Sequence, residues 1–308
     1  MERDLIRWLR DALPKHAQVP IAAGHDDAAL INWNSPGCVA TVDVLMEGVD
    51  FRLAEVDPRR VGHKALAVNL SDLAAMAAKP RAALVGLVLP REGGQALAIS
   101  LYEGIIPLAE RYEVAIAGGD VNSWDGPLVI SVTALGEPTA RGTLRRGGAR
   151  PGDQILVTGS FGGSLLGRHL DFEPRVREAL LLNDRYRLSA AIDVSDGLAV
   201  DVHHIAEESG CGALLDLDNV PIDPAAHRLC EQSGEGSTPL ERALGDGEDF
   251  ELVLAVGADE AARLLADQPL EVRLTCIGEF IDEPGLWQRN RDRSRAPLAV
   301  RGYEHRLS

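Results

Sequence analysis

Lysine, cysteine and long apolar runs are all scarce in this sequence, and these scarcities limit the classes of protein that it can belong to. The only lysines among the 308 residues are Lys15, Lys64 and Lys79, so arginine carries nearly all of the positive charge. Lys and Arg together total 31 against 47 Asp and Glu, which gives a formal net charge of -16. Such an acidic protein is unsuited to nucleic acid or to an anionic membrane, so we expect neither as a partner. An anionic ligand can still bind where divalent cations bridge it to the protein.

The four cysteines are far apart in the chain and form no CxxC pair. This usage is typical of thiols in a reducing compartment and not of a disulfide framework or a zinc site. The first residues, MERDLIRWLRDALPKH, predict a charged amphipathic helix without the apolar core of a signal peptide. The longest apolar strings, such as AALVGLVLP, are too short to span a bilayer. We therefore expect a cytoplasmic protein.

Both halves of the chain contain alternating strand-like and helix-like segments, in a composition typical of globular proteins. In the first half, helical spacing of apolar residues predicts helices at 58–78 and 93–112. Runs of β-branched residues there predict strands at 38–46, 82–90, 113–120 and 127–137. In the second half, strands are predicted at 153–159, 190–194, 212–218, 249–256 and 274–280. Because Pro, Gly and Arg without apolar periodicity fill 137–152, we predict two domains, 1–137 and 138–308.

Acidic residues recur beside glycines and at predicted strand ends. In GHDDAALI, Asp26 and Asp27 follow a glycine with no Lys or Arg nearby. The others in such positions are Asp43, Asp120, Asp193, Asp196, Glu248 and Asp249. Strand ends beside glycines are where α/β proteins place ligands, because the backbone there can approach a bound group closely. An Asp beside a Gly is also ordinary turn chemistry, so each example alone fits either interpretation.

Asp72 differs because it lies inside a predicted helix, NLSDLAAMAA, among apolar residues. Burying a carboxylate there is costly unless it is paired or metal-bound, and the alternative is an exposed position. Oxygen ligands without a nearby Cys or His set favour Mg²⁺ or Mn²⁺ over zinc, and magnesium usually keeps positions for water and phosphate. The acids together therefore suggest a magnesium–nucleotide site. TGSFGGSLLG lacks the lysine of a Walker motif and no kinase-type catalytic loop occurs, so any ATP site has another architecture.

Seven motifs then occur in chain order: GHDDAAL, TVDVLMEGVDF, KALAVNLSDLAAMAAKP, AGGDVNSWDGPLVISVTALGE, RRGGARPGDQILVTGSFGGS, AIDVSDGLAVDVHHIAEESGCGA and GDGEDFELVLAV. Together they closely resemble the thiamine-monophosphate kinase family, part of the aminoimidazole-ribonucleotide synthetase-like superfamily. The match runs from about residue 20 to the C-terminal RGYEH. The resemblance implies an α/β (α+β) fold of two domains, with mixed sheets flanked by helices. It also implies a homodimer, in which strands of the N-terminal domains meet at the interface.

The resemblance implies transfer of the ATP γ-phosphoryl group to thiamine monophosphate, giving thiamine diphosphate, with several Mg²⁺ ions as cofactor. The implied metal ligands are Asp27, Thr41, Asp43, Asp72, Asp120, Asp193 and Asp196. The implied ATP contacts are Gly119, Asp120, Arg146 and Ser195, and the implied substrate contacts are Asp50, Glu248 and Tyr303. A phosphate acceptor is largely ionised at pH 7, so no general base is expected. Catalysis should then depend on the metal ions, and Asp72, Asp120 and Asp196 should be the most important residues for it. Arg146 is either a fixed cation for the polyphosphate or a solvated linker arginine.

The chain departs from the family pattern at four places. Val42 replaces a usual Thr, Asp50 replaces a usual His in EGVDF, and Asp246 replaces a usual Gly. The segment 162–176, GGSLLGRHLDFEPRV, is shorter than is usual in the family. A carboxylate at residue 50 would repel a phosphate dianion unless a cation intervenes. Two alternatives therefore remain: a related ATP-dependent enzyme with another acceptor, or a non-catalytic ATP-binding sensor.

Overall fold

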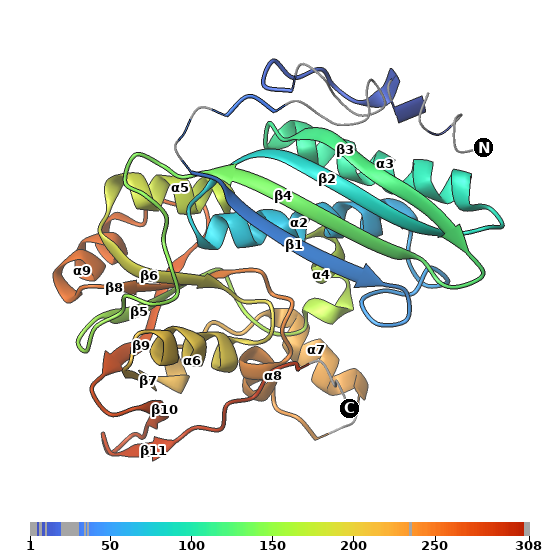
Figure 1. Cartoon of the computed structure of the whole chain (residues 1–308). Coiled ribbons are helices and arrows are strands. Elements are labelled where there is room, and N and C mark those ends of the chain that lie inside the picture. The colour runs from blue at the N-terminus through green and yellow to red at the C-terminus, as the bar shows by residue number, and fades with distance from the viewer. Residues whose placement is uncertain are drawn as a thin grey trace. The chain divides into compact units, whose positions relative to one another are not determined.

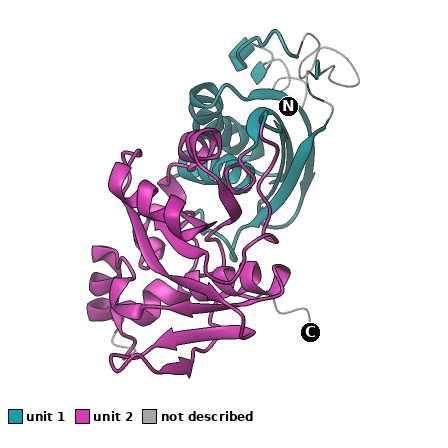
Figure 2. Ribbon diagram, turned by 90° about the vertical axis from the view of Figure 1, so that its left-hand side faces the viewer, with its two compact units in different colours: residues 1–73, 78–140 teal, residues 74–77, 141–308 magenta. Residues whose placement is uncertain are grey.

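The computed structural model describes residues 5, 8–9, 11–19, 31–33, 35, 37–233 and 236–304. The chain divides into two compact units, coloured separately in Figure 2. Unit 1 comprises Met1–Leu73 and Ala78–Ala140, and unit 2 comprises Ala74–Ala77 and Arg141–Ser308. Asp26, Asp27 and much of the predicted N-terminal helix lie outside the described residues. The domain limits 1–137 and 138–308 stay a prediction.

Unit 1 is a four-stranded mixed sheet with two long helices on one of its faces (Figure 1). Its elements are β1 (Val39–Met46), α2 (Pro58–Ala75), β2 (Lys79–Pro90), α3 (Gly94–Arg111), β3 (Ala115–Trp124) and β4 (Val129–Glu137). The strand order is β1-β4-β2-β3. β2 and β3 are parallel, and the other two pairs are antiparallel. All six elements were predicted from the sequence, with shifted ends.

Alternation along β1 and periodicity along α2 explain how this unit packs. Successive side chains of a strand point to opposite faces, so Leu45 is buried while Val42 and Val44 are exposed. Along α2, Leu66, Leu70 and Leu73 recur at helical spacing and are fully buried. The helices therefore cover one face of the sheet, and apolar side chains of β1 remain uncovered on the other.

Unit 2 is built on a seven-stranded mixed sheet with the order β11-β10-β7-β9-β5-β8-β6. Its strands are β5 (Gln154–Thr158), β6 (Leu188–Asp193), β7 (Gly212–Leu215), β8 (Leu252–Val256), β9 (Leu274–Ile281), β10 (Gly285–Arg289) and β11 (Arg295–Pro297). Its α-helices are α4 (Arg168–Asp171), α5 (Val176–Arg185), α6 (Leu198–Glu208), α7 (Pro224–Ser233), α8 (Pro239–Gly245) and α9 (Ala258–Asp267). The five strands predicted here are present, and β10 and β11 were not predicted.

A continuous apolar core supports unit 2. Ile155, Val253 and Phe280 from the sheet are fully buried together with Val202 and Ile205 of α6. The four cysteines are free thiols. Within the described part of the chain, no helix combines the length and apolarity that crossing a membrane requires. The predicted α/β class, with two mixed sheets flanked by helices, is confirmed.

Candidate functional site

Unit 1 brings the carboxylates of β1 and α2 close to each other. Thr41 and Asp43 are two residues apart on β1, so their side chains point to the same face of the sheet. The Thr41 hydroxyl donates a hydrogen bond to the Asp72 carboxylate of α2. Asp72 is half-buried. The predicted helical acid is therefore paired with a strand residue that the resemblance also assigns to metal binding.

Asp43 has the most strongly shifted carboxyl group among the described residues of unit 1. Burial, together with the negative charges of Asp72 and Asp50, raises its pKa to about 7. Its Oδ2 atom is buried and has no hydrogen-bond partner among the described residues. An unpaired buried carboxylate oxygen beside two other acids is costly without a cation. This unpartnered oxygen is a ligand of the kind that a hard divalent cation such as Mg²⁺ takes.

Asp50 lies in a tight loop directly after β1. Its Oδ2 accepts a hydrogen bond from the Met46 N–H at 2.7 Å, and its carbonyl accepts one from the Lys64 ammonium at 3.2 Å. Gly48 has a φ of +90°, a left-handed conformation that favours glycine. Lys64 is fully buried. The carboxylate that replaces the family histidine thus closes its own loop, beside a buried cation.

The strand predicted at 38–46 matches β1, so Asp43 lies within that strand and not at its end, since residues 44–46 remain paired with β4. The strand end predicted at Asp120 is wrong. β3 continues past Asp120 to Trp124, since residues 118–124 pair with 84–90 of β2. Glycine beside an acid resembled a strand end, but the length of the neighbouring strand decides where pairing stops.

Gly119 and Asp120 lie on β3 opposite Val85 and Gly86 of β2. A Cβ atom on Gly119 would lie 1.9 Å from the Val85 carbonyl oxygen, so no other residue fits there. Asp120 is exposed, and its cross-strand partner Gly86 has no side chain to cover it. The two glycines together leave this carboxylate accessible from the middle of a rigid strand.

In unit 2 the turn from β6 into α6 carries Asp193, Ser195 and Asp196. Asp193 is buried at the last position of β6, which confirms that it ends a strand. The buried Asp201 carboxylate accepts hydrogen bonds from the N–H groups of Asp196 at 3.2 Å and Gly197 at 3.1 Å. Asp201, in the first helical turn of α6, therefore holds the backbone between β6 and α6 in place.

Three segments distant in sequence meet at this turn. The Glu248 N–H donates to the Ser195 carbonyl at 2.7 Å, and the Tyr303 N–H donates to the Asp196 carbonyl at 2.9 Å. A Cβ on Gly247 would lie 2.7 Å from the Ser195 carbonyl oxygen, so a glycine is required for this approach. The structure thereby places Ser195 and Asp196 beside Glu248 and Tyr303. We call this hydrogen-bonded meeting point the turn junction.

The segment around Glu248 is held in an unusual backbone conformation. Glu248 and Phe250 have φ values of +53° and +51°, which L-residues adopt only under constraint. This conformation explains why the strand predicted from residue 249 begins only at Leu252. Between them Asp249 is buried, and its carboxylate accepts two hydrogen bonds from the Gly162 N–H and one from Arg168.

The short segment 162–176 supplies the support beneath Glu248. Arg168 bonds the Asp249 carboxylate, and the Phe172 ring stacks on Phe250 with centroids 4.0 Å apart. Burial raises the pKa of Asp249 to about 7, and the Arg168 charge opposes that shift. Arg175 forms two hydrogen bonds with Glu251, at 2.8 and 2.6 Å. The segment 162–176 therefore packs against residues 249–251 and stabilises them next to the turn junction.

Arg146 shares an electrostatic environment with the same turn. Asp201, 3.6 Å from Nδ1 of His204, raises the pKa of that histidine, while the positive charge of Arg146 lowers it. Asp196 raises it further. The Arg146 carbonyl accepts a hydrogen bond from the Ser209 hydroxyl at 3.3 Å. The charges of Arg146 and Asp196 thus both act on His204, in opposite directions.

The described residues form two groups of candidate residues, one in each unit. Unit 1 groups Thr41, Asp43, Asp50 and Asp72, with Gly119 and Asp120 on β3. Unit 2 groups Asp193, Ser195, Asp196, Glu248 and Tyr303, with Arg146 nearby. Sequence reasoning missed the supporting roles of Lys64, Arg168 and Asp201, although an acid in the first turn after SDGL was a visible signal. Among the residues that the structure describes, no three His, Cys, Asp or Glu side chains gather closely enough to hold a metal. Asp27 is not among the described residues.

Comparison with known proteins identifies both halves of the chain. The N-terminal domain model of AIR synthase related proteins matches residues 25–137, and their C-terminal domain model matches residues 154–286. A thiamine-monophosphate kinase of Rhodopirellula baltica is 46% identical over 299 residues, which are 94% of this chain and 92% of that protein. One of Bacillus subtilis is 33% identical, with 99% of both chains covered.

Solved structures agree with these relatives. The crystal structure of thiamine-monophosphate kinase from Stenotrophomonas maltophilia superposes with a TM-score of 0.78 at 33% identity, covering 92% of this chain and 94% of that one. The structure of AaThiL in complex with AMPPCP and TMP gives 0.76 at 27% identity, covering 99% and 96%. Escherichia coli HypE gives 0.82 at 20% identity, covering 99% and 98%, a likeness of fold alone.

The two domains are those of the AIR synthase related proteins, a class of two-domain α/β proteins. Within that class the chain belongs to the thiamine-monophosphate kinase family.

Proposed function

We propose that this chain transfers the γ-phosphoryl group of ATP to thiamine monophosphate, releasing thiamine diphosphate and ADP. An oxygen of the acceptor phosphate forms a bond to the γ-phosphorus as the bond from that phosphorus to the β,γ-bridging oxygen breaks, and ADP keeps that oxygen. Family membership sets the reaction class. The observation that carries the proposal is the turn junction, where the assigned ATP contact Ser195 adjoins the assigned substrate contacts Glu248 and Tyr303.

The acceptor requires no general base, which suits a site built of carboxylates. A phosphate monoester has a second pKa of about 6, so it is largely ionised at neutral pH. Phosphoryl transfer is then catalysed chiefly by positioning and by neutralising charge. The described acids are held by hydrogen bonds from Thr41 or lie on rigid strands, which is what positioning requires.

The residues that would hold Mg²⁺ are Asp27, Thr41, Asp43, Asp72, Asp120, Asp193 and Asp196. The unpartnered buried Oδ2 of Asp43 supports this assignment in unit 1. When bound, magnesium would offset the negative charge that the polyphosphate and the acceptor bring together. Asp120 offers an exposed carboxylate, and Gly119 keeps the backbone beside it bare.

The remaining contacts suit the two substrates. Arg146 would pair with the ATP polyphosphate, since a guanidinium matches phosphate oxygens through two parallel hydrogen bonds. Glu248 and the half-exposed Tyr303 ring would face thiamine, whose thiazolium carries a positive charge that carboxylates and aromatic faces attract. Asp50 contributes chiefly by shaping its loop, because its carboxylate already accepts the Met46 N–H.

A homodimer is also part of the proposal. The uncovered face of the unit 1 sheet exposes Val42 by 59%, Val44 by 55%, Met46 by 41% and Leu84 by 37%. A contiguous run of exposed β-branched and apolar side chains on a sheet is typical of an interaction surface. We propose that the same face of a second copy covers it.

The proposed reaction is tested by ADP release from MgATP with and without thiamine monophosphate, together with identification of the product. Acceptor-dependent ADP release with formation of thiamine diphosphate is the expected outcome. Magnesium-dependent ATP binding without acceptor-dependent turnover would contradict the proposal and favour a non-catalytic ATP-binding protein.

A further inference from the structure

A pocket of about 380 Å³ in unit 2 has a strongly cationic lining. It lies between the segment 141–147 and the segment 183–189, which ends α5 and begins β6. Its lining contains Arg141, Arg145 and Arg187, and it contains no Asp or Glu. In a chain with a formal net charge of -16, such a local excess of positive charge is unusual. A volume near 400 Å³ is within the range of about 300–1,000 Å³ that small-molecule sites occupy.

The pocket walls are fixed to each other by hydrogen bonds. The Ala191 N–H donates to the Arg145 carbonyl at 3.0 Å, which holds the first segment along β6. The Arg141 guanidinium donates to the Tyr186 carbonyl at 3.0 Å, and the Asn183 amide donates to the Gly142 carbonyl at 3.2 Å. The three arginines therefore emerge from a connected backbone frame, which is how a pre-formed site is built.

Two nearby carboxylates, those of Glu260 and Asp267, already have other partners. Glu260 accepts the Arg187 backbone N–H at 2.9 Å and forms an ion pair with Arg263 at 3.3 Å. Asp267 accepts the Tyr186 hydroxyl at 2.9 Å. The side chains of Arg145 and Arg187 are exposed and make no hydrogen bond or ion pair with any residue that the structure describes. Two guanidinium groups thus remain available to a ligand at the pocket.

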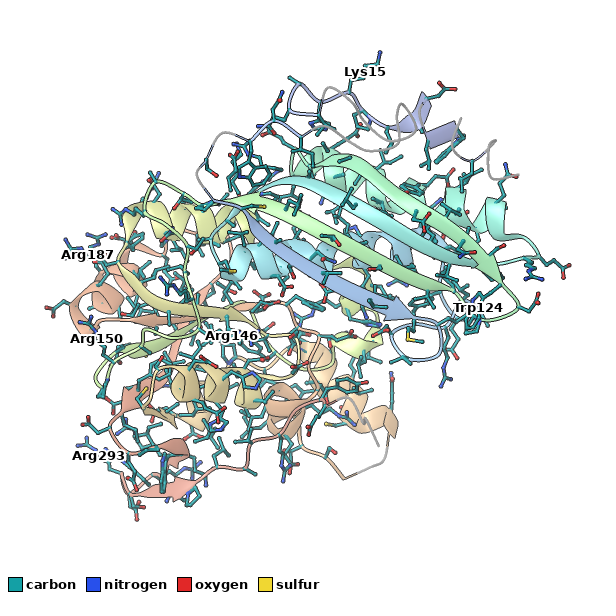
Figure 3. The ribbon with its side chains drawn as sticks, viewed as in Figure 1. Lys15, Trp124, Arg146, Arg150, Arg187 and Arg293 are labelled. Atoms are coloured by element: carbon teal, nitrogen blue, oxygen red, sulfur yellow. The ribbon has the colours of Figure 1, made fainter. Side chains whose placement is uncertain are left out.

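We propose that this pocket binds the phosphate groups of a phosphorylated small molecule. Guanidinium groups pair with phosphate oxygens through two parallel hydrogen bonds, and three positive charges match a diphosphate better than a single carboxylate. Arg146, the proposed ATP contact of unit 2, is absent from the lining, although its neighbours Arg145 and Gly147 are part of it, and Figure 3 shows Arg146 well apart from Arg187. The inference does not depend on the kinase reaction, because it concerns binding alone.

Calorimetric titration of the full chain with inorganic pyrophosphate, in the presence of EDTA and without nucleotide, tests this site. Arg187→Gln removes one pocket charge and keeps the side-chain length. Loss of a charge-assisted hydrogen bond at an exposed position should weaken pyrophosphate binding by about tenfold. Arg293→Gln is the matched control, because Arg293 is also exposed and lies far from Arg187 in Figure 3. It should bind pyrophosphate as the unchanged protein does.

Arg146→Gln distinguishes the pocket from the proposed ATP site, and it should leave pyrophosphate binding unchanged. Circular dichroism melting curves verify that each variant folds, and Arg145→Gln provides a second pocket variant. Three outcomes would overturn the inference. They are no binding at millimolar pyrophosphate, equal affinity in Arg187→Gln and Arg293→Gln, or a loss of binding in Arg146→Gln alone.

Discussion

The Asp50 carboxylate and the Met46 backbone are joined by a hydrogen bond of 2.7 Å, which closes the loop after β1. The acid that replaces the family histidine is therefore oriented towards its own backbone. Its carbonyl is also tied to the buried Lys64 ammonium. These two contacts would explain how a carboxylate can occupy a position that the resemblance assigns to substrate binding.

Asp50→Ala should disturb the loop more than Asp50→Asn does. Asparagine keeps an oxygen that can accept the Met46 N–H, whereas alanine removes it, at a cost of about 0.5–1.5 kcal/mol in unfolding free energy. We expect the KM for thiamine monophosphate to rise about tenfold in Asp50→Ala, because the loop loses its shape. Steady-state kinetics and urea denaturation measure both effects. If Asp50→Asn behaved as Asp50→Ala does, the charge and not the loop contact would be what matters.

Gly119→Ala should destabilise the protein strongly, because the new Cβ would meet the Val85 carbonyl oxygen at 1.9 Å. Forcing β3 away from β2 should cost about 3 kcal/mol or more in unfolding free energy and abolish ATP binding. Gly118→Ala is the matched control on the same strand, since its Cβ would meet only a Leu84 methyl at 3.5 Å. Urea unfolding should show a small change for Gly118→Ala. Equal midpoints for the two variants would contradict this account of the strand pair.

Magnesium affinity should depend on pH through Asp43, whose pKa is raised to about 7. Because the folded protein holds this proton more tightly than the unfolded chain, the metal-free protein should lose stability as pH rises through about 7. For the same reason Mg²⁺ must displace a proton below that pH, and its affinity should fall there by up to about tenfold per pH unit. Calorimetric titration with Mg²⁺ across this range measures the effect.

The control for that titration is the pair Asp43→Asn and Asp125→Asn. Asp43→Asn should weaken Mg²⁺ binding and remove its pH dependence near neutrality. Asp125 is an exposed acid of the same unit, paired with Arg91 at 3.1 Å, and Asp125→Asn should leave both unchanged. A pH profile that persists in Asp43→Asn would assign the titration to another group.

Val44→Glu should disrupt the proposed dimer. It places a charge in the middle of the exposed apolar face of the unit 1 sheet. The dissociation constant of the dimer should rise at least tenfold, which corresponds to a loss of about 1.4 kcal/mol or more in binding free energy. Sedimentation velocity at several protein concentrations measures the change. Val300→Glu, at an exposed valine of unit 2, serves as control. A monomeric unchanged protein, or a dimer insensitive to Val44→Glu, would contradict the proposed interface.

The sequence was most informative where a strong period determines structure. The apolar spacing of α2 predicted both that helix and the unusual position of Asp72, and the β-branched runs predicted the central strands. It was less informative at the end of β3, because Asp120 is followed by further paired residues whose extent depends on the neighbouring strand β2. β10 and β11 were not predicted because they are only five and three residues long, too short for an alternating pattern to be recognised.

No local sequence pattern predicts the arrangement of the turn junction. Glu248 reaches Ser195 only because Glu248 and Phe250 adopt left-handed conformations, which nothing in their side chains favours. Arg168, which bonds Asp249, is 81 residues away from it in sequence. Motif resemblance named the residues at this point, but hydrogen bonds between distant segments determine how they are held.

The turn junction also has a consequence for how the protein is made. The junction is formed by three backbone segments, residues 195–197, 247–250 and 302–303. The ribosome therefore synthesises these segments at widely separated times. The ordering of a non-local contact has to overcome loop-closure entropy before it gains any bond. A nascent chain can therefore complete the β6–α6 turn early, whereas the side that carries Tyr303 closes only after residue 303 has been synthesised. The proposed binding of thiamine monophosphate at Tyr303 should consequently appear only after that point.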